Sequence, residues 1–136
     1  MATHTLHMAV PPGDVDAVHA LLETVWADVP DIPMMERFKF ETALLELASN
    51  VVKHADGGYG LWCTLEIDAQ PGRIEAMVLD DGEPSDAQVL VPREMPDELS
   101  ESGRGIAMIQ ALVDDLAYSR EGTTNRWRIS RRFTPE

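Results

Sequence analysis

Three polar side chains that could perform chemistry recur every four residues between positions 46 and 54. They are Glu46, Asn50 and His54, and a spacing of four places them along one stripe of a helix. The carboxylate could act as a base, and the asparagine carbonyl oxygen is a hard ligand that suits Mg²⁺. The imidazole would be their polar neighbour. Taken alone, however, the spacing is more typical of the ordinary polar face of an amphipathic helix.

A second candidate is the run Asp80-Asp81-Gly82, at the end of a segment that is expected to form a buried strand. An aspartate at such a strand end can accept a hydrogen bond from an exocyclic amine, such as the amine of adenine. Gly82 has no side chain and would let the backbone come close to a flat ring. By itself, the run is better explained as a plain Asp-Gly turn.

A third candidate is the run Gly103-Arg104-Gly105-Ile106, which is expected to open a helix. Glycines at this place leave backbone N–H groups free to bind phosphate, and the helix dipole adds to the attraction. The guanidinium of Arg104 could pair with phosphate oxygens. The run does not follow a strand, so it is no dinucleotide-binding fingerprint, and it lacks the Gly-Lys-Ser/Thr of a P-loop.

Hydrophobic periodicity predicts the elements that must position these residues. The predicted fold class is an α+β two-layer sandwich, in which helices cover one face of a mainly antiparallel, mixed sheet. The stretch between the second hairpin strand and the third helix has almost no periodic pattern, which is typical of either a functional lid or a disordered segment. The predicted elements are a strand near 6–10, helices over 14–29 and 33–55, strands over 61–67 and 74–79, a helix over 105–116, and strands over 117–120 and 126–133.

The second predicted helix is apolar over a wide arc, so we expect it to be largely buried. One stripe is mainly apolar, and a neighbouring stripe of leucine and valine widens it. The first stripe consists of Met35, Phe38, Thr42, Leu45, Ser49 and Val52, and the second of Leu44, Leu47 and Val51.

Length and composition limit the classes of protein that are possible. The chain has 136 residues and weighs 15.1 kDa, which fits one domain over residues 1–136. Its formal net charge of −13 argues against bulk nucleic-acid binding and against an anionic membrane surface, because both recruit Lys and Arg. Cys63 is the single cysteine, so an intrachain disulfide is impossible and a reducing, cytoplasmic compartment is expected. The sequence shows neither a secretory signal nor an apolar run long enough to span a membrane.

The charge is unevenly distributed along the chain. The segment 120–136 holds five arginines against two glutamates, so the rest of the chain is even more acidic than the total suggests. An acidic surface of this kind either keeps a protein soluble or attracts a basic partner. Charge alone does not distinguish these two explanations.

Taken together and in this order, the three runs resemble the nucleotide-binding boxes of the GHKL ATPase superfamily. Within it, the sequence is most similar to the small anti-sigma-factor serine kinases, and the resemblance extends over nearly the whole chain. The run from Glu46 to Ala55 resembles their N box, Asp80-Asp81-Gly82 the first glycine box, and Gly103-Arg104-Gly105-Ile106 the second. Gly122-Thr123-Thr124 resembles the Gly-Thr turn before the last strand.

The resemblance implies a Bergerat-type ATP-binding fold and a protein kinase that uses ATP and Mg²⁺. In such a kinase Glu46 would be the general base that takes the proton from a serine hydroxyl, and Asn50 would bind Mg²⁺. Asp80 would recognise the adenine amine, with Thr124 supporting it. The other ATP-binding residues that the resemblance implies are Gly82, Gly103, Arg104, Gly105 and Ile106, and residues 83–104 would form the ATP lid.

The resemblance also implies protein partners. Members of this group bind a sigma factor, phosphorylate a serine of a STAS-type antagonist, and are typically homodimers. Two features of this chain depart from their pattern: the residues after Gly82 lack a Phe-Asp-Pro run, and the implied lid is acidic. The alternative is therefore a non-catalytic binding module of the same fold, which switches protein partners by contact alone.

Overall fold

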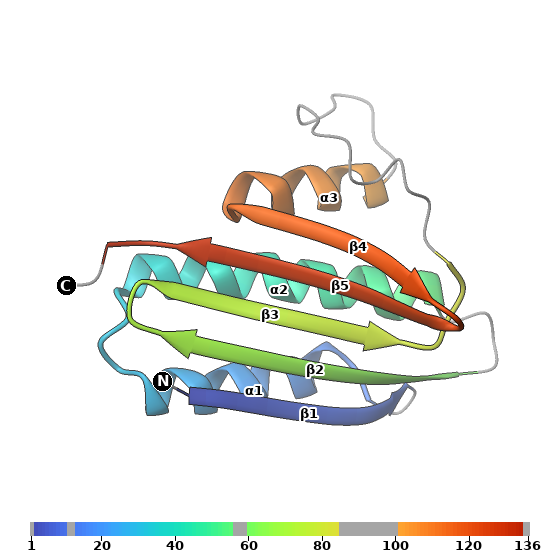
Figure 1. The fold of residues 1–136 in the computed structure, drawn as a ribbon, viewed down its shortest axis with the longest axis horizontal. Helices are drawn as coiled ribbons and strands as arrows, with labels where there is room; N and C mark the ends of the chain where they lie inside the picture. The colour runs from blue at the N-terminus through green and yellow to red at the C-terminus, as the bar shows by residue number, and fades with distance from the viewer. Residues whose placement is uncertain (1, 11–12, 56–59, 85–100, 135–136) are drawn as a thin grey trace.

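The chain, described by a computed structural model, folds into strands and helices in the predicted order (Figure 1). The structure describes residues 2–10, 13–55, 60–84 and 101–134. Its elements are β1 (Ala2–Val10), α1 (Val15–Asp28), α2 (Met34–Ala55), β2 (Leu61–Gln70), β3 (Arg73–Asp80), α3 (Glu101–Leu112), β4 (Asp115–Glu121) and β5 (Thr124–Arg132).

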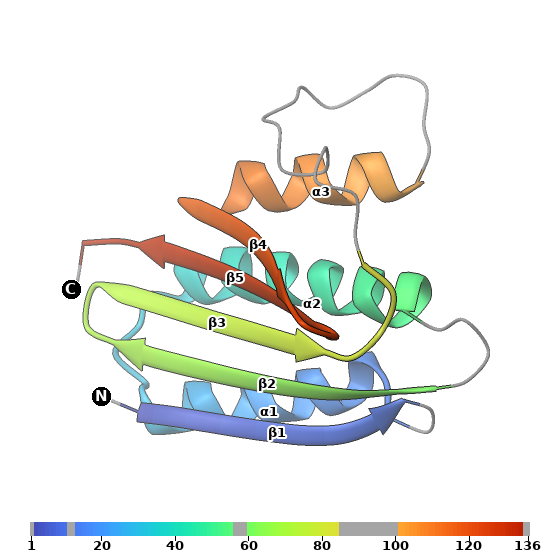
Figure 2. The same cartoon turned by 45° about the vertical axis from the view of Figure 1, so that its right-hand side comes forward.

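The five strands form one sheet in the order β1-β2-β3-β5-β4. Each neighbouring pair of these strands is antiparallel, so the sheet is antiparallel throughout rather than mixed. Among the described residues, the three helices lie on the same face of the sheet, and no helix covers the other face (Figures 1 and 2). This is the predicted two-layer α+β sandwich. In the described parts of the chain, no helix combines the length and the hydropathy that crossing a membrane requires.

Alternation along the strands divides the sheet into a core face and an outer face. In β2 the residues Leu61, Cys63, Leu65, Ile67 and Ala69 are buried, while their neighbours are more exposed. In β5 the side chains of Trp127 and Ile129 are buried, whereas Arg126, Arg128 and Arg132 are exposed, as the period of two requires. Phe133, just beyond β5, is only partly buried.

The N-terminal ends of the first two helices follow local rules. Asp14 caps α1, because its side-chain Oδ1 accepts a hydrogen bond from the backbone N–H of Asp16 at 3.0 Å. Pro33 directly precedes α2, where its fixed φ suits a helix start, and its carbonyl oxygen accepts the backbone N–H of Arg37 at 3.1 Å.

The predicted burial of α2 is only half right. The stripe with Leu44, Leu47 and Val51 is buried in the core. The other stripe is only partly covered: Leu45 and Val52 pack against the core, whereas Met35 and Phe38 at its beginning are each 62% exposed. The reason is geometric: the sheet covers one side of α2, so a helix that is apolar over so wide an arc has apolar residues left outside.

The third helix begins four residues earlier than predicted, at Glu101, and ends at Leu112 rather than at position 116. Gly103, Arg104 and Gly105 therefore lie within the first turns of α3 and not before it. A glycine inside a helix costs only about 1 kcal/mol, which tertiary packing can outweigh. Leu116 belongs instead to β4, where it pairs with Ile129. Of the predicted lid 83–104, residues 101–104 are helical and residues 85–100 lie outside the described part.

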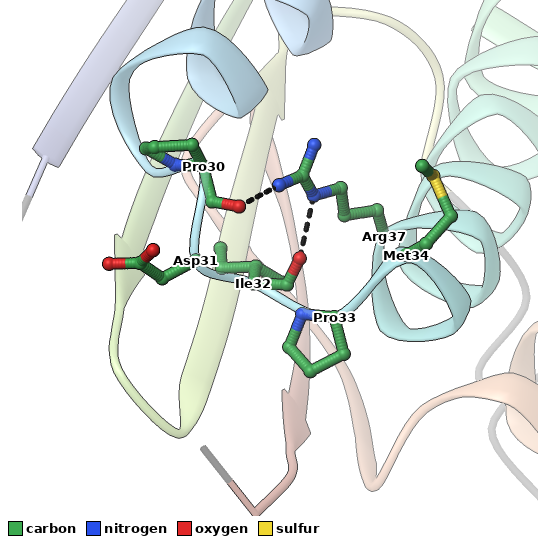
Figure 3. Close-up of a pocket in the computed structure, with 6 residues that line it drawn as sticks. All are labelled: Pro30, Asp31, Ile32, Pro33, Met34 and Arg37. Atoms are coloured by element: carbon green, nitrogen blue, oxygen red, sulfur yellow. Dashed lines mark hydrogen bonds between the residues drawn. The ribbon is translucent and has the colours of Figure 1, made fainter. Parts of the chain in front are cut away.

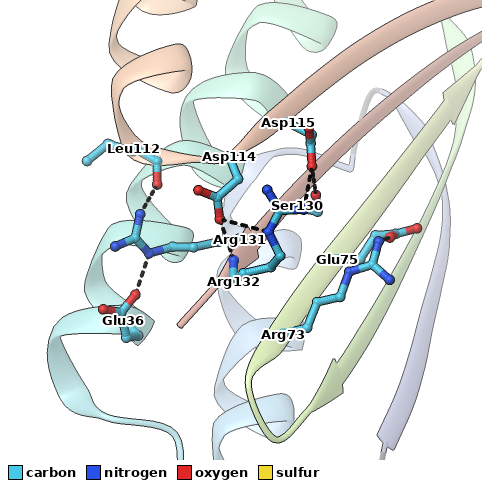
Figure 4. A network of polar contacts seen from close by, with 9 residues as sticks. All are labelled: Glu36, Arg73, Glu75, Leu112, Asp114, Asp115, Ser130, Arg131 and Arg132. Atoms are coloured by element: carbon cyan, nitrogen blue, oxygen red, sulfur yellow. Dashed lines mark hydrogen bonds and ion pairs between the residues drawn. The ribbon is translucent and has the colours of Figure 1, made fainter. Parts of the chain in front are cut away.

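Arg131 and Arg132, two of the five arginines in the basic segment 120–136, have acidic partners (Figure 4). Arg131 donates from Nε to the Glu36 carboxylate and from Nη1 to the Leu112 carbonyl oxygen at 2.7 Å. It thereby connects β5 to the start of α2 and the end of α3. Arg132 lies 3.7 Å from Asp115 but is far more exposed.

We expect Arg131→Ala to lower the free energy of unfolding by about 2 kcal/mol, because it leaves the Glu36 carboxylate and the Leu112 carbonyl without their partner. The Arg131 and Glu36 side chains are only 16% and 19% exposed, so water replaces the lost contacts poorly. Arg132→Ala is the matched control, since that side chain is 65% exposed and its removal should change stability by less than about 0.5 kcal/mol. Urea denaturation of both variants measures the difference, and equal effects would contradict this role of Arg131.

Candidate active site

Asp80 ends β3 with a buried carboxylate, 3% exposed. Its Oδ1 accepts two hydrogen bonds at 2.9 Å, one from the backbone N–H of Gly82 and one from Nδ2 of Asn125. No described residue donates a hydrogen bond to Oδ2. Asp80 therefore has one oxygen held by the protein and one left as an acceptor for a ligand.

Burial raises the pKa of Asp80 above the usual range for aspartate. The hydrogen bonds from Asn125 and from Gly82 oppose this shift because they stabilise the ionised form, and the nearby charge of Arg120 acts in the same direction. The neighbouring Asp81 carboxylate adds to the rise of the Asp80 pKa. The Asp80 carboxylate is thus shielded from water, and its ionised form is stabilised by the hydrogen bonds from Asn125 and Gly82 and by the charge of Arg120.

The residue that supports Asp80 is Asn125 rather than Thr124. Thr124 begins β5 with an exposed side chain, whereas Asn125 is 2% exposed and lies directly opposite Asp80 in the register of β3 and β5. Sequence reasoning missed Asn125, although a signal was present. The alternation of β5 places Asn125 on the same face as Trp127 and Ile129, so a polar residue was to be expected on the buried side of the strand.

Glu46 and Asn50 lie where α2 packs against α3, and the residue that meets them there is Gly105. A Cβ atom at position 105 would overlap Glu46 Oε1 and lie 3.0 Å from Asn50 Nδ2. Gly105 is therefore needed for the close approach of the two helices, rather than for a loop ahead of α3. Ile106, the next residue, is 4% exposed and packs into the core.

The side chain of Asn50 contains an orphaned polar atom. Its Nδ2 is buried and has no hydrogen-bond partner among the described residues. An unpaired buried amide costs about 1–3 kcal/mol, so such an atom is typical of a site that a ligand completes.

The elements that carry these residues meet at one end of the sheet. The end of β3, the C-terminal half of α2 and the start of α3 all lie at the same end of the sheet (Figures 1 and 2). Of the sequence-predicted residues, Glu46, Asn50 and Gly105 meet directly, while Asp80 and Gly82 form their own contact. Gly103 and Arg104 belong to the first turn of α3.

The donor set of this site fits Mg²⁺ bound together with phosphate. The described residues contain no group of three His, Cys, Asp or Glu side chains that could form a metal cage. Mg²⁺ commonly uses one or two protein oxygens, several waters and substrate phosphates, so the Asn50 carbonyl oxygen is a sufficient protein ligand. The orphaned Nδ2 of the same side chain can donate to a phosphate oxygen.

We expect Gly105→Ala to reduce catalysis much more than stability. The added methyl group must displace the Glu46 carboxylate, which is the far end of a flexible side chain and can move. Alanine also favours the helix by up to about 1 kcal/mol over glycine, which offsets the strain. The measurements are the melting temperature and the turnover with saturating Mg-ATP. A variant with the turnover of the wild type would contradict the assigned contact.

A different hollow lies at the other end of α2, in the connection from α1 (Figure 3). It is lined by Pro30, Asp31, Ile32, Pro33, Met34 and Arg37. The guanidinium of Arg37 is occupied there, because it donates to the backbone carbonyl oxygens of Pro30 and Ile32. Arg37 is therefore held by the backbone of this connection, and the hollow lies apart from Glu46, Asn50 and Asp80.

Comparison with known proteins agrees with this fold. The family model described as the histidine kinase-like ATPase domain matches residues 9–130. The catalytic domain of the histidine kinase ThkA superposes with a TM-score of 0.54 at 11% identity, over 97% of this chain and 99% of that chain. The histidine kinase domain of the Erythrobacter litoralis EL346 blue-light activated histidine kinase gives a TM-score of 0.54 at 20% identity. That alignment covers 74% of this chain and 46% of the other, so this chain spans about half of its length. No curated protein matches the chain by sequence.

Proposed function

Because the chain belongs to the family of histidine kinase-like ATPase domains, we propose that it is an Mg-ATP-dependent serine-protein kinase and an anti-sigma factor. The observation that carries the kinase proposal is the convergence of Glu46 and Asn50 on Gly105, at the end of the sheet where Asp80 presents a free acceptor oxygen. A carboxylate without a hydrogen-bond partner among the described residues is suited to accept a proton.

In the proposed reaction Asp80 Oδ2 accepts a hydrogen bond from the adenine amine. Asn50 would hold Mg²⁺ through its side-chain oxygen, and the ion would supply positive charge against the triphosphate. Glu46 accepts the proton of the substrate serine hydroxyl while the serine oxygen bonds to the γ-phosphorus. The bond from that phosphorus to the β,γ-bridging oxygen breaks, and ADP leaves with its electron pair.

The proposed substrate is a serine of a STAS-domain antagonist, and the proposed second partner is a sigma factor. The net charge of −13 supports association with a basic protein. An exposed apolar cluster at the start of α2 supports protein binding as well, because flexible methionine and aromatic side chains suit such surfaces. The cluster consists of Met34, Met35 and Phe38, which are 77%, 62% and 62% exposed. We propose a cytoplasmic location, with neither nucleic acid nor membrane as a partner.

Release of a fluorescent sigma factor tests this proposal and its alternative, the non-catalytic module. The complex of chain and sigma factor is mixed with the STAS antagonist and Mg-ATP, and anisotropy is followed in time. We expect the antagonist to displace the sigma factor at first. The sigma factor should then rebind, because phosphorylation adds negative charge to the antagonist and weakens its binding to this acidic chain. With a non-transferable ATP analogue the displacement should persist. Persistence with both nucleotides would indicate the non-catalytic module.

The open face of the sheet supports a homodimer. Glu66, Met77 and Arg128 form one row across β2, β3 and β5, and the burial pattern of these strands places the row on the face of the sheet opposite the core. A two-fold axis parallel to β3 at Met77 would set Glu66 of each copy opposite Arg128 of the other. Trp62, which is 65% exposed on the same face, adds the kind of side chain that anchors interfaces.

Charge reversal tests this dimer. Arg128→Glu should shift the chain toward monomer in sedimentation velocity, because it opposes Glu66 of the second copy. The double variant with Glu66→Arg should restore the dimer. A dimer unaffected by the single reversal, or a monomeric wild type, would rule out this interface.

A further inference from the structure

We propose that Asn125 is the positioning residue that gives the nucleotide site its preference for a base with an exocyclic amine. This inference rests on the proposed ATP-binding function and assigns the preference to a side chain that lies behind the pocket. Asn125 is buried in β5, opposite the end of β3.

Every hydrogen-bonding group of the Asn125 amide is engaged. Its Nδ2 donates to Asp80 Oδ1 at 2.9 Å and to the Glu83 carbonyl oxygen at 2.7 Å, with the Gly82 carbonyl oxygen at 3.3 Å. Its Oδ1 accepts from Tyr118 Oη at 2.5 Å and from Arg120 Nη1 at 2.9 Å. The partners of Nδ2 are all acceptors and the partners of Oδ1 are all donors, which defines the orientation of the amide. A flipped amide would set its NH₂ group against donors and its oxygen against acceptors.

This arrangement decides what Asp80 offers to a ligand. With Oδ1 held by Asn125 and Gly82, the carboxylate cannot rotate freely, and Oδ2 remains as a pure acceptor. An acceptor matches the amine of adenine and opposes the carbonyl oxygen that hypoxanthine carries at the same position. Asn125 also holds the carbonyl oxygens of Gly82 and Glu83, so that these groups stay in place beside the carboxylate.

Charged and titratable groups around Asp80 come from each neighbouring element. Asp81 follows it, Cys63 lies opposite it in β2, and Arg120 and Tyr118 reach Asn125 from β4. Of these, the Arg120 charge favours ionised Asp80 and the Asp81 charge disfavours it. The Cys63 thiol is buried with its pKa raised to about 11, so it stays neutral at physiological pH. Among the contacts that lower the pKa of Asp80 and so favour its ionised form, the hydrogen bond from Asn125 has the largest effect.

Two substitutions separate positioning from mere structure. Asn125→Leu keeps the approximate shape and removes the donor, so protonated Asp80 becomes more populated and can donate to a carbonyl oxygen. We expect the ratio of the ITP to the ATP dissociation constant to fall at least about tenfold from the wild-type ratio. Asn125→Asp sets a second carboxylate beside Asp80, and the pair must share a proton to bind ATP. Wild-type affinity for ATP should weaken on acidification, whereas the affinity of Asn125→Asp should strengthen.

Calorimetric titration of the whole chain with Mg-ATP and Mg-ITP, from pH 5.5 to 8.5, measures these effects. Ser130→Ala is the control, since Ser130 is buried in the same strand and donates to Asp115 at 3.0 Å, away from Asp80. The control should keep the wild-type ratio and pH profile even where its melting temperature falls. An unchanged ratio in Asn125→Leu together with a wild-type pH profile in Asn125→Asp would overturn this inference alone. A wild-type chain that binds neither nucleotide would overturn the proposed function and this inference together.

Discussion

Glu46→Gln is expected to remove phosphotransfer while leaving ATP binding nearly unchanged. General-base catalysis contributes about 10²–10⁴-fold to such reactions, so turnover should fall at least about 100-fold. Glutamine has the length of glutamate and can occupy the same place against Gly105, so the packing of α2 on α3 survives the change. The loss is therefore chemical, and it should appear in kcat and not in the ATP dissociation constant.

Glu41→Gln is the matched control for this experiment. Glu41 lies on the same helix but on the side toward α1, where it accepts from Trp26 Nε1 at 3.4 Å. Its neutralisation should leave antagonist phosphorylation at the wild-type rate. Glu46→Gln with turnover within about threefold of wild type would remove Glu46 from the role of base, because a missing base costs far more.

Asp80→Asn is expected to abolish ATP binding without unfolding the chain. The asparagine Oδ1 can still accept from Gly82 and Asn125, so the contacts that hold the strand end are preserved. In the variant, however, an NH₂ group replaces the free acceptor Oδ2, and this donor would face the donating amine of adenine. Loss of the bond and the opposed donors should weaken ATP binding at least about 100-fold, which corresponds to about 2.7 kcal/mol.

The pKa of Asp80 adds two checks to this prediction. Because burial raises that pKa, ionised Asp80 costs folding free energy at neutral pH, and the neutral asparagine should not lower the melting temperature. In the wild type, protonation of Asp80 removes the acceptor, so ATP affinity should fall with falling pH earlier than for an ordinary aspartate. Asp81→Asn is the control, since Asp81 is exposed and accepts from the backbone N–H of Trp62 through Oδ1, which asparagine retains. An Asp80→Asn chain that binds ATP like wild type would contradict the pocket.

Much of this fold follows from patterns that the sequence displays openly. The alternation of buried and exposed residues in β2 and the cap that Asp14 forms on α1 depend only on neighbouring residues. The start of α3 and the exposure of Met35 and Phe38 were beyond local patterns. Gly105 lies inside α3 because α2 approaches it too closely for a side chain, and this contact is invisible in the local sequence. The exposure of Met35 and Phe38 depends on how much of α2 the sheet covers.

The site shows the same division. The spacing of Glu46 and Asn50 predicts that they share a helix face, and the structure brings them to one glycine. The role of Asn125 depends on the pairing of β3 with β5, which is a contact between segments far apart in the chain. Its neighbour Thr124 looks equally suitable in the sequence, and only the register of the strands selects between them.

Mass spectrometry of the antagonist tests the central claim most directly. The chain is incubated with Mg-ATP and the STAS-domain proteins of its source organism, and each protein is examined for a mass increase that maps to a serine. We predict one phosphoserine on one STAS protein, formed by the wild type and absent with Glu46→Gln. Binding of a STAS protein without any phosphoserine would contradict the kinase and leave a domain that acts by contact alone.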